Sequence, residues 1–211
     1  MSIICFEGPS AVGKTTTSTA LEASTGAYVV PEVNQLFSRP KDEPPEWYFE
    51  RQLDRWSITV EQSKTHQLVI LDGDPFQPLW YNWAYNFIGW QELGFLERFY
   101  KPRIQTGEIG FPDLYIILSA SEEELRQRRA GDVIRRRRGF ATHLKLIEPQ
   151  RRYFEVMKCN APNRVQFLQA ERIEKTVKFV RSIDRDLIEK NENYSTDLLD
   201  AMIYWLRANE A

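Results

Sequence analysis

Short apolar runs alternate with longer amphipathic segments along this chain. The runs are Ile3–Phe6, Ala27–Val30, Leu68–Leu71, Leu114–Leu118 and Arg164–Leu168. Runs of this length are typical of strands that are buried on both faces of a parallel sheet. The segments with helical spacing are Thr15–Ala23, Glu46–Lys64, Phe76–Trp90, Leu144–Cys159 and Ile173–Ile183. The alternation predicts an α/β fold in which a five-stranded parallel sheet lies between two layers of helices.

An amphipathic segment from Ser195 to Asn209 extends past the last strand–helix pair. We expect it either to close the core as an extra C-terminal helix or to make a contact in a homodimer. The chain has 211 residues, of which 42% are hydrophobic and 13% aromatic, which predicts one domain, residues 1–211, with a substantial core. This aromatic content argues against a disordered chain.

The loop between the first predicted strand and helix carries a phosphate-binding motif. Gly8 and the sequence Gly13-Lys14-Thr15 satisfy G-x-x-x-x-G-K-[ST], the P-loop pattern. Glycines let the backbone N–H groups approach phosphate oxygens, and the following helix has a partly positive N-terminus. We expect Lys14 to reach the β- and γ-phosphates and the Thr15 hydroxyl to hold Mg²⁺.

The alternative interpretation of this loop is a glycine-rich turn without a ligand. The strand–loop–helix setting favours the P-loop. Its expected nucleotide-binding residues are Gly8, Ser10, Ala11, Val12, Gly13, Lys14, Thr15 and Thr16.

Carboxylates follow the second and third predicted strands. In an open α/β sheet the ligand crevice lies outside the carboxyl ends of the strands, so Glu32 is a candidate general base for a substrate hydroxyl. A helix-start or loop acid is the alternative. Asp72 is a candidate Mg²⁺ ligand through water, or a residue that positions the acceptor hydroxyl. A plain turn is the alternative, because Asp-Gly and Asp-Pro are ordinary turn sequences.

Two further segments carry candidate chemistry. Phe76–Trp90 has more rings than a helix can bury against a sheet, so we expect one or two of them to contact a ligand. Arginines follow the fourth predicted strand: Arg126, Arg128, Arg129 and then Arg135–Arg138. They fit a lid, residues about 121–150, that neutralises phosphate charge in a transition state. A solvated charged face and a nucleic-acid contact are the alternatives.

The net charge, the apolar runs, the cysteines and the histidines limit the expected partners, cellular compartment and metal sites. The net charge is −2, so we expect no nucleic-acid partner. We find no apolar run of membrane-spanning length and no signal-peptide pattern, and expect no membrane partner. Cys5 and Cys159 lack the spacing of a zinc site or a redox pair, which predicts a reduced, cytoplasmic setting. His66 and His143 do not form a cluster, and we assign neither a metal role.

The order of these features resembles the P-loop kinases of nucleosides and nucleotides, especially the deoxynucleoside kinase and thymidylate kinase group. The resemblance extends from Ser2 to about Ile183 and implies the P-loop kinase fold with an arginine-rich lid. Glu32 matches the carboxylate of the family's Pro-Glu segment, a proposed base. Asp72 matches the acid that opens the family's Asp/Glu-Arg motif.

The resemblance also covers the lid and the base of the nucleotide. Arg126, Arg128 and Arg129 fall where the family's lid begins, and the loop from Ala170 to Ile173 falls where the family holds the adenine of ATP. One position departs from the pattern, because Gly73 stands where the family has arginine. Either Arg51 or Arg55 compensates, or the acceptor is not a usual nucleoside, since kinases of this shape also act on antibiotics and other small alcohols.

These features together imply an ATP-dependent kinase with ATP and Mg²⁺ as cofactors. Lys14, Arg126 and Arg129 would stabilise the γ-phosphoryl group. Glu32 or Asp72 would accept a hydroxyl proton, and Thr15 and Asp72 would hold the metal. The acceptor is a hydroxyl or phosphate of a nucleoside- or nucleotide-like molecule, or an antibiotic or other small alcohol. A nucleotide-binding regulatory ATPase and a nucleic-acid-binding ATPase are alternatives of another class.

Overall fold

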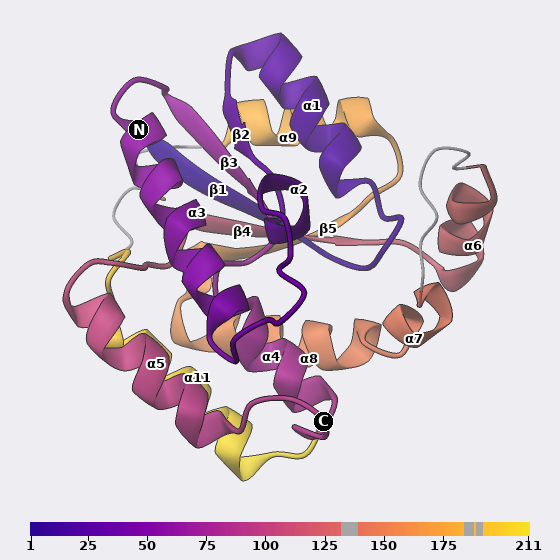
Figure 1. Ribbon diagram of the computed structural model, residues 1–211. Coiled ribbons are helices and arrows are strands. Elements are labelled where there is room, and N and C mark those ends of the chain that lie inside the picture. The colour runs from indigo at the N-terminus through magenta and orange to yellow at the C-terminus, as the bar shows by residue number, and fades with distance from the viewer. Residues whose placement is uncertain (132–138, 184–187, 189–191) are drawn as a thin grey trace.

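The computed structural model describes residues 1–131, 139–183, 188 and 192–211. The run Arg135–Arg138 lies outside the described residues. The five strands are β1 (Ser2–Glu7), β2 (Tyr28–Val30), β3 (Leu68–Asp72), β4 (Leu114–Ser119) and β5 (Val165–Gln169). They form one parallel sheet in the order β2-β3-β1-β4-β5 (Figure 1). Each strand begins and ends within one residue of its predicted run, so the predicted sheet is confirmed.

Helices follow every strand. In the first half of the chain they are α1 (Lys14–Thr25), α2 (Val33–Leu36), α3 (Trp47–Ser63), α4 (Gln77–Ala84) and α5 (Leu93–Gln105). In the second half they are α6 (Glu122–Gly131), α7 (Phe140–Leu144), α8 (Ile147–Asn160), the 3-10 turn η1 (Pro162–Arg164), α9 (Ile173–Ser182) and α11 (Thr196–Ala208). Figure 1 shows α1 and α9 on one face of the sheet and α3, α4, α5, α8 and α11 on the other.

Alternate residues of each strand build two separate cores. Ile3 and Cys5 of β1 pack with α3, α4, α5, α8 and α11, whereas Ile4 and Phe6 pack on the opposite face with α1, α6, α7 and α9. This two-sided burial explains why the strands read as continuous apolar runs rather than as alternating ones. The predicted three-layer α/β/α architecture is therefore confirmed.

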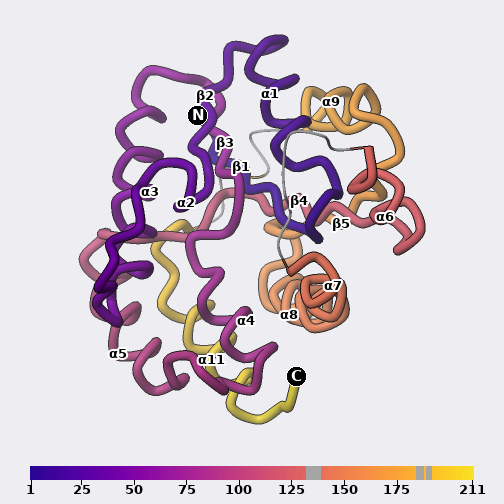
Figure 2. Tube along the Cα trace, turned by 45° about the vertical axis from the view of Figure 1, so that its right-hand side comes forward, coloured from indigo at the N-terminus to yellow at the C-terminus, as the bar shows by residue number. Residues whose placement is uncertain are grey.

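The site lies where the chain leaves the carboxyl ends of β1, β2 and β3. The loop after β1 leads to α1 on one face of the sheet, and the loop after β3 leads to α4 on the other (Figure 2). Connections that leave neighbouring strands for opposite faces open a crevice between them, which is the usual ligand site of such sheets.

One predicted helix is shorter than expected. The aromatic segment Phe76–Trp90 is helical only to Ala84, because Asn86 and Phe87 adopt positive φ angles of 50° and 57°. The N–H of Phe87 donates to the Asn82 carbonyl at 2.8 Å, which closes the end of the helix. The loop that follows turns Trp90 back toward the Tyr81 ring, with the ring centroids 5.3 Å apart.

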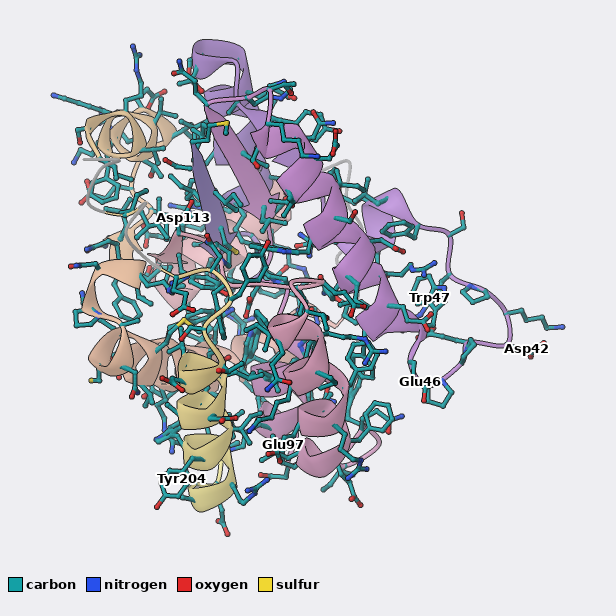
Figure 3. All side chains as sticks on the ribbon, turned by 90° about the vertical axis from the view of Figure 1, so that its left-hand side faces the viewer. Asp42, Glu46, Trp47, Glu97, Asp113 and Tyr204 are labelled. Carbon is teal, nitrogen blue, oxygen red and sulfur yellow. The ribbon has the colours of Figure 1, made fainter. Side chains whose placement is uncertain are left out.

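The C-terminal helix closes the core. Its buried residues are Leu198, Leu199, Met202, Ile203 and Leu206, and they pack against α5 and α8. Its outer face carries Tyr204, which is 75% exposed (Figure 3). The proline-rich segment before α3 projects outward with Asp42 at its tip, as Figure 3 also shows. Within the described residues, the search for a helix long and apolar enough to cross a bilayer finds none.

Candidate active site

The phosphate loop, residues 8–16, has the backbone that anion binding requires. Gly8, Ala11 and Gly13 all have positive φ, at 139°, 71° and 107°. A Cβ on Gly8 would lie 2.3 Å from the Leu118 carbonyl oxygen, so only glycine lets the loop cross the end of β4 this closely. Gly13 is the N-cap of α1 and caps it without a side chain, which leaves the partly positive helix end facing the loop.

The side chains of Lys14, Thr15 and Asp72 meet at this loop. The Lys14 ammonium donates to the Gly8 carbonyl oxygen at 2.8 Å, so it lies over the loop. The Thr15 hydroxyl donates to Asp72 Oδ2 at 2.7 Å. The loop after β1 and the end of β3 are thus joined by a hydrogen bond between two residues 57 positions apart in the sequence.

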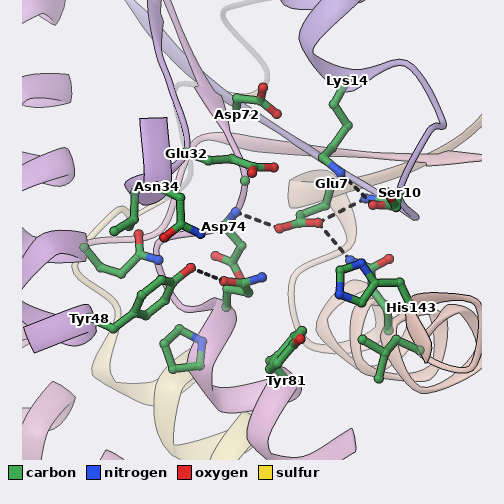
Figure 4. Close-up of a pocket in the computed structure, with 18 of the residues that line it drawn as sticks. Glu7, Ser10, Lys14, Glu32, Asn34, Tyr48, Asp72, Asp74, Tyr81 and His143 are labelled. Atoms are coloured by element: carbon green, nitrogen blue, oxygen red, sulfur yellow. Dashed lines mark hydrogen bonds between the residues drawn. The ribbon is translucent and has the colours of Figure 1, made fainter. Parts of the chain in front are cut away.

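A cavity of about 1290 Å³ opens between the phosphate loop and the helices on the other face of the sheet. One part is lined by residues 8–16. The rest is lined by α2, α3, α4, the loop after α4 and α8, with Glu32, Tyr48, Gln52, Asp74 and Tyr81 among the lining residues (Figure 4). Binding sites for one small molecule usually have roughly 300–1,000 Å³, so this cavity has room for two.

Glu7 connects the two parts of the cavity. It is the last residue of β1 and is 3% exposed. Its carboxylate accepts hydrogen bonds from Gly8 N at 3.0 Å, Asp74 N at 2.8 Å and Gln150 Nε2 at 2.8 Å. Burial raises the pKa of Glu7, and the nearby Lys14 ammonium opposes the rise. The position of Glu7 therefore fixes the phosphate loop, the end of β3 and α8 relative to one another.

Asp74 lies in the same network and is fully buried. Its Oδ1 accepts from Tyr115 Oη at 2.8 Å and from Phe76 N at 2.9 Å, whereas its Oδ2 has no partner among the described residues. Burial, with a further contribution from the Glu7 carboxylate, raises the pKa of Asp74 to about 7. A carboxyl group in this environment changes charge near neutral pH.

Arg55 supports the floor of the cavity from α3. It is 1% exposed, and its Nε donates to the Pro31 carbonyl at 2.8 Å. Its Nη2 donates to the carbonyls of Asp72 and Gly73 at 2.9 and 3.0 Å, and its Nη1 donates to Gln52 Oε1 at 2.6 Å. One buried guanidinium thus ties together the ends of β2 and β3, the two strands that present Glu32 and Asp72.

Comparison with known proteins gives structural matches only. No protein-family model and no curated protein sequence matches the chain. Two solved structures of deoxyadenosine kinase from M. mycoides do match. The first, with the products dCMP and a flexible dCDP bound, has a TM-score of 0.55 at 16% identity, over 85% of this chain and 96% of the kinase. The second, with bound dATP, has a TM-score of 0.52 at 17% identity, over 85% and 97%. The chain has a deoxynucleoside kinase-like fold.

In this kinase-like fold the structure brings the predicted P-loop residues, Glu32 and Asp72 to one cavity. It does not bring Arg126 and Arg129 there. Arg126 pairs with Glu122 on the exposed face of α6, and the Arg129 guanidinium lies 4.8 Å from the centre of the Phe140 ring. Their proposed contact with phosphate stays a prediction.

Arg128 makes the contact that links α6 to the phosphate loop. Its Nη1 donates to the Val12 carbonyl at 2.9 Å, and its Nη2 donates to the Ala170 carbonyl at 2.5 Å. The helix begins with the predicted capping box, in which Ser121 and Glu124 exchange hydrogen bonds of 2.8 and 3.2 Å. The cap sets the register that places Arg128 one turn later, over the loop.

Sequence reasoning missed several lining residues. Glu7 could have been identified from the sequence, because a carboxylate at the end of an otherwise apolar strand is unusual and needs hydrogen-bond partners. His143 has no such signal, since a single histidine is common, and Asp74 belongs to the pair of acids after the third predicted strand, in which the sequence favours Asp72. Burial and then the Lys14 charge lower the pKa of His143, which favours a neutral imidazole at the cavity wall. Of the two proposed substitutes for the missing arginine, Arg55 lies at the cavity and Arg51 pairs with Asp54 instead.

The residues present fit a magnesium ion that is shared with phosphates. The described residues contain no group of three or more metal-binding side chains, so no cation site is built from protein alone. Mg²⁺ commonly uses one or two protein oxygens and completes its shell with phosphate oxygens and water. The Thr15 hydroxyl donates to Asp72 Oδ2, and Asp72 Oδ1 is buried without a hydrogen-bond partner among the described residues, so the two side chains place oxygen atoms together at the phosphate loop.

Proposed function

We propose that this protein is an ATP-dependent kinase that transfers the γ-phosphoryl group to a hydroxyl of a small-molecule acceptor, nucleoside-like or another alcohol. The observation that carries the proposal is the single cavity that holds both the phosphate loop and the carboxylates following β2 and β3. A phosphate site alone fits a nucleotide-binding regulator as well. A phosphate site that opens directly onto a partly buried acid and a second compartment fits transfer between two bound substrates.

In the proposed reaction the acceptor oxygen forms a bond to the γ-phosphorus as the bond to the β–γ bridging oxygen breaks. ADP leaves with that oxygen, and the acceptor proton passes to a carboxylate. Lys14 supplies positive charge to the β- and γ-phosphates, and the N–H groups at the start of α1 supply more. A magnesium ion held by Thr15 and Asp72 would neutralise phosphate charge.

Glu32 is the better candidate for the base. Asp72 Oδ2 already accepts the Thr15 hydroxyl, and its residue is 1% exposed. Glu32 is partly buried and lines the cavity at the N-cap of α2, next to Gly73. A general base has to come within hydrogen-bond reach of the hydroxyl, and Glu32 has the more open position.

The test measures ADP release with ATP and Mg²⁺, first alone and then with nucleosides, nucleoside monophosphates and amino or neutral sugar alcohols. A kinase releases little ADP alone and much more with its acceptor, whereas a regulatory ATPase releases ADP without any acceptor. Lys14→Ala should abolish transfer and keep the far-ultraviolet circular dichroism spectrum. Lys178→Ala is the matched control, because Lys178 is exposed on α9 and does not line the cavity. Full transfer by Lys14→Ala refutes the proposal.

A further inference from the structure

Carboxylates outnumber cations in the wall of the cavity. Among the described lining residues the acids are Glu7, Glu32, Glu43, Asp72 and Asp74, and the cations are Lys14, Arg39 and Arg55. Arg39 and Glu43 hydrogen-bond to each other in an exposed loop, so their charges offset each other. Four acids and two cations remain around the junction of the two parts of the cavity.

Neither remaining cation is available to an acceptor. The Lys14 ammonium lies over the phosphate loop, where it would meet the phosphates of the nucleotide. The three guanidinium nitrogens of Arg55 donate to three backbone carbonyls and to Gln52. In the described residues, the acceptor part of the cavity therefore presents negative charge without a free counter-charge.

Two of these acidic side chains flank a position that has no side chain of its own. A Cβ on Gly73 would lie 3.7 Å from Glu32 Cγ and 3.8 Å from Glu7 Oε1, so the glycine faces a gap flanked by these two side chains. The next residue, Asp74, adds a fully buried carboxyl group whose Oδ2 has no hydrogen-bond partner in the described chain. Buried carboxylates are costly, and a cation bound in the gap would reduce that cost through charge attraction.

We propose that the acceptor is a cationic amino alcohol whose ammonium group binds in the gap beside Gly73, between Glu7 and Glu32. The proposal rests on the kinase function proposed above and names the substrate class. The hydroxyl of the same molecule takes the phosphoryl group, and the ammonium group forms and breaks no bond. A nucleoside monophosphate would instead bring a second anion toward four carboxylates, so the same wall disfavours it.

The aromatic lining also suits a cationic acceptor. The rings of Tyr81 and Trp90 line the same cavity, and aromatic faces attract cations as well as the apolar body of a ligand.

The first experiment compares acceptors that differ in charge. The full chain with ATP and Mg²⁺ is given kanamycin and its fully N-acetylated form, 3′-amino-3′-deoxyadenosine and deoxyadenosine, and dAMP. ADP release gives KM and kcat for each. One charge-assisted hydrogen bond corresponds to roughly 10- to 100-fold in affinity, so an accepted amine should have a KM lower by that factor than its neutral partner. Equal use of amine and neutral forms, turnover of dAMP, or no use of either amine contradicts the proposal.

The second experiment places a cation in the gap. Gly73→Lys should remove the preference for amines, because the new ammonium group takes the place of the ligand's. Gly73→Ala separates the effect of charge from that of space: it strains the same positive φ of 96° and fills part of the gap without adding charge, so it should reduce the preference for amines less than Gly73→Lys does. If both variants fail to fold, Asp74→Asn replaces them and should reduce the preference several-fold. An unchanged preference in Gly73→Lys, or in Asp74→Asn, contradicts the proposal.

Nucleotide binding separates the two proposals. Stabilisation of the protein by ADP with Mg²⁺, measured as a rise in Tm that Lys14→Ala abolishes, tests the phosphate loop alone. If this rise is absent, the kinase proposal itself fails. If it is present and neutral acceptors are preferred, the kinase proposal stands and the cationic acceptor is refuted.

Discussion

Replacing Asp74 with asparagine should change the free energy of unfolding, relative to the wild type, in favour of the variant as the pH rises. Asparagine keeps an oxygen for the Tyr115 hydroxyl and the Phe76 N–H, and it removes the buried negative charge. The pKa of Asp74 is about 7 in the folded protein, against an ordinary value of 3.8, mainly because of burial and then because of the Glu7 carboxylate. The substitution therefore isolates the cost of ionising this group inside the fold.

The sign and size follow from linkage between proton binding and folding. Between pH 3.8 and about 7 the folded protein holds a proton on Asp74 that the unfolded chain has lost. The stability that this carboxyl group contributes is fully present below pH 3.8 and falls as pH rises through the folded pKa. Each pH unit between the two values corresponds to about 1.4 kcal/mol, so the whole change is roughly 4 kcal/mol. About 3 kcal/mol of it falls between pH 5 and pH 8.

Urea unfolding of wild type and Asp74→Asn at pH 5 and pH 8 measures this difference. We expect the free energy of unfolding of the variant, relative to wild type, to increase by about 3 kcal/mol from pH 5 to pH 8. Asp42→Asn at the exposed loop tip is the control and should differ from wild type by less than about 0.5 kcal/mol at either pH. A difference for Asp74→Asn that does not change with pH, or that changes in the opposite direction, would show that the carboxyl group is ionised at no cost.

Four further variants test the site. Glu32→Gln should lower turnover by roughly 10² or more and leave the Kd for ATP near normal, which stopped-flow and equilibrium titration can separate; unchanged turnover would move the base elsewhere. Arg55→Met should lower the free energy of unfolding by about 3 kcal/mol or more, because it leaves buried carbonyls without donors, and a loss below about 1 kcal/mol in urea unfolding would contradict this. Arg128→Ala should raise the KM for ATP several-fold. Arg126→Ala should lower kcat only if α6 moves and brings Arg126 to the phosphates. Steady-state kinetics on both variants decides between the two arginines.

The sheet and the phosphate loop could be predicted from the sequence because their signals are local. Strands buried on both faces leave unbroken apolar runs, and the P-loop needs its glycines, lysine and threonine at fixed spacing. Glu32 and Asp72 could be identified because they follow strands, and parallel strands bring their carboxyl ends to one edge. The helix over Phe76–Trp90 was predicted too long, because the positive φ of Asn86 and Phe87 has no strong signature in residue type.

The residues that could not be predicted act through distant contacts. Glu7 is held by Asp74 N and Gln150 Nε2, which are 67 and 143 positions away in the sequence. Arg55 could be suspected of facing a ligand, but its bonds to Pro31, Asp72 and Gly73 depend on how α3 crosses two strands. Among the arginines of α6, sequence alone does not show which one faces inward. The helical register set by its cap decides this.

The hydrogen bonds of Arg128 limit how this protein can be recombined with its structural relatives. A chimera that exchanges residues 122–131 would replace the side chain that donates to the carbonyls of Val12 and Ala170. Such a graft would keep this support only if it brought an arginine at the same helical position, one turn after the capping glutamate. Crossover points are therefore better placed so that residues 8–16, 122–131 and 170 come from the same parent. These three segments should be exchanged together in any such chimera.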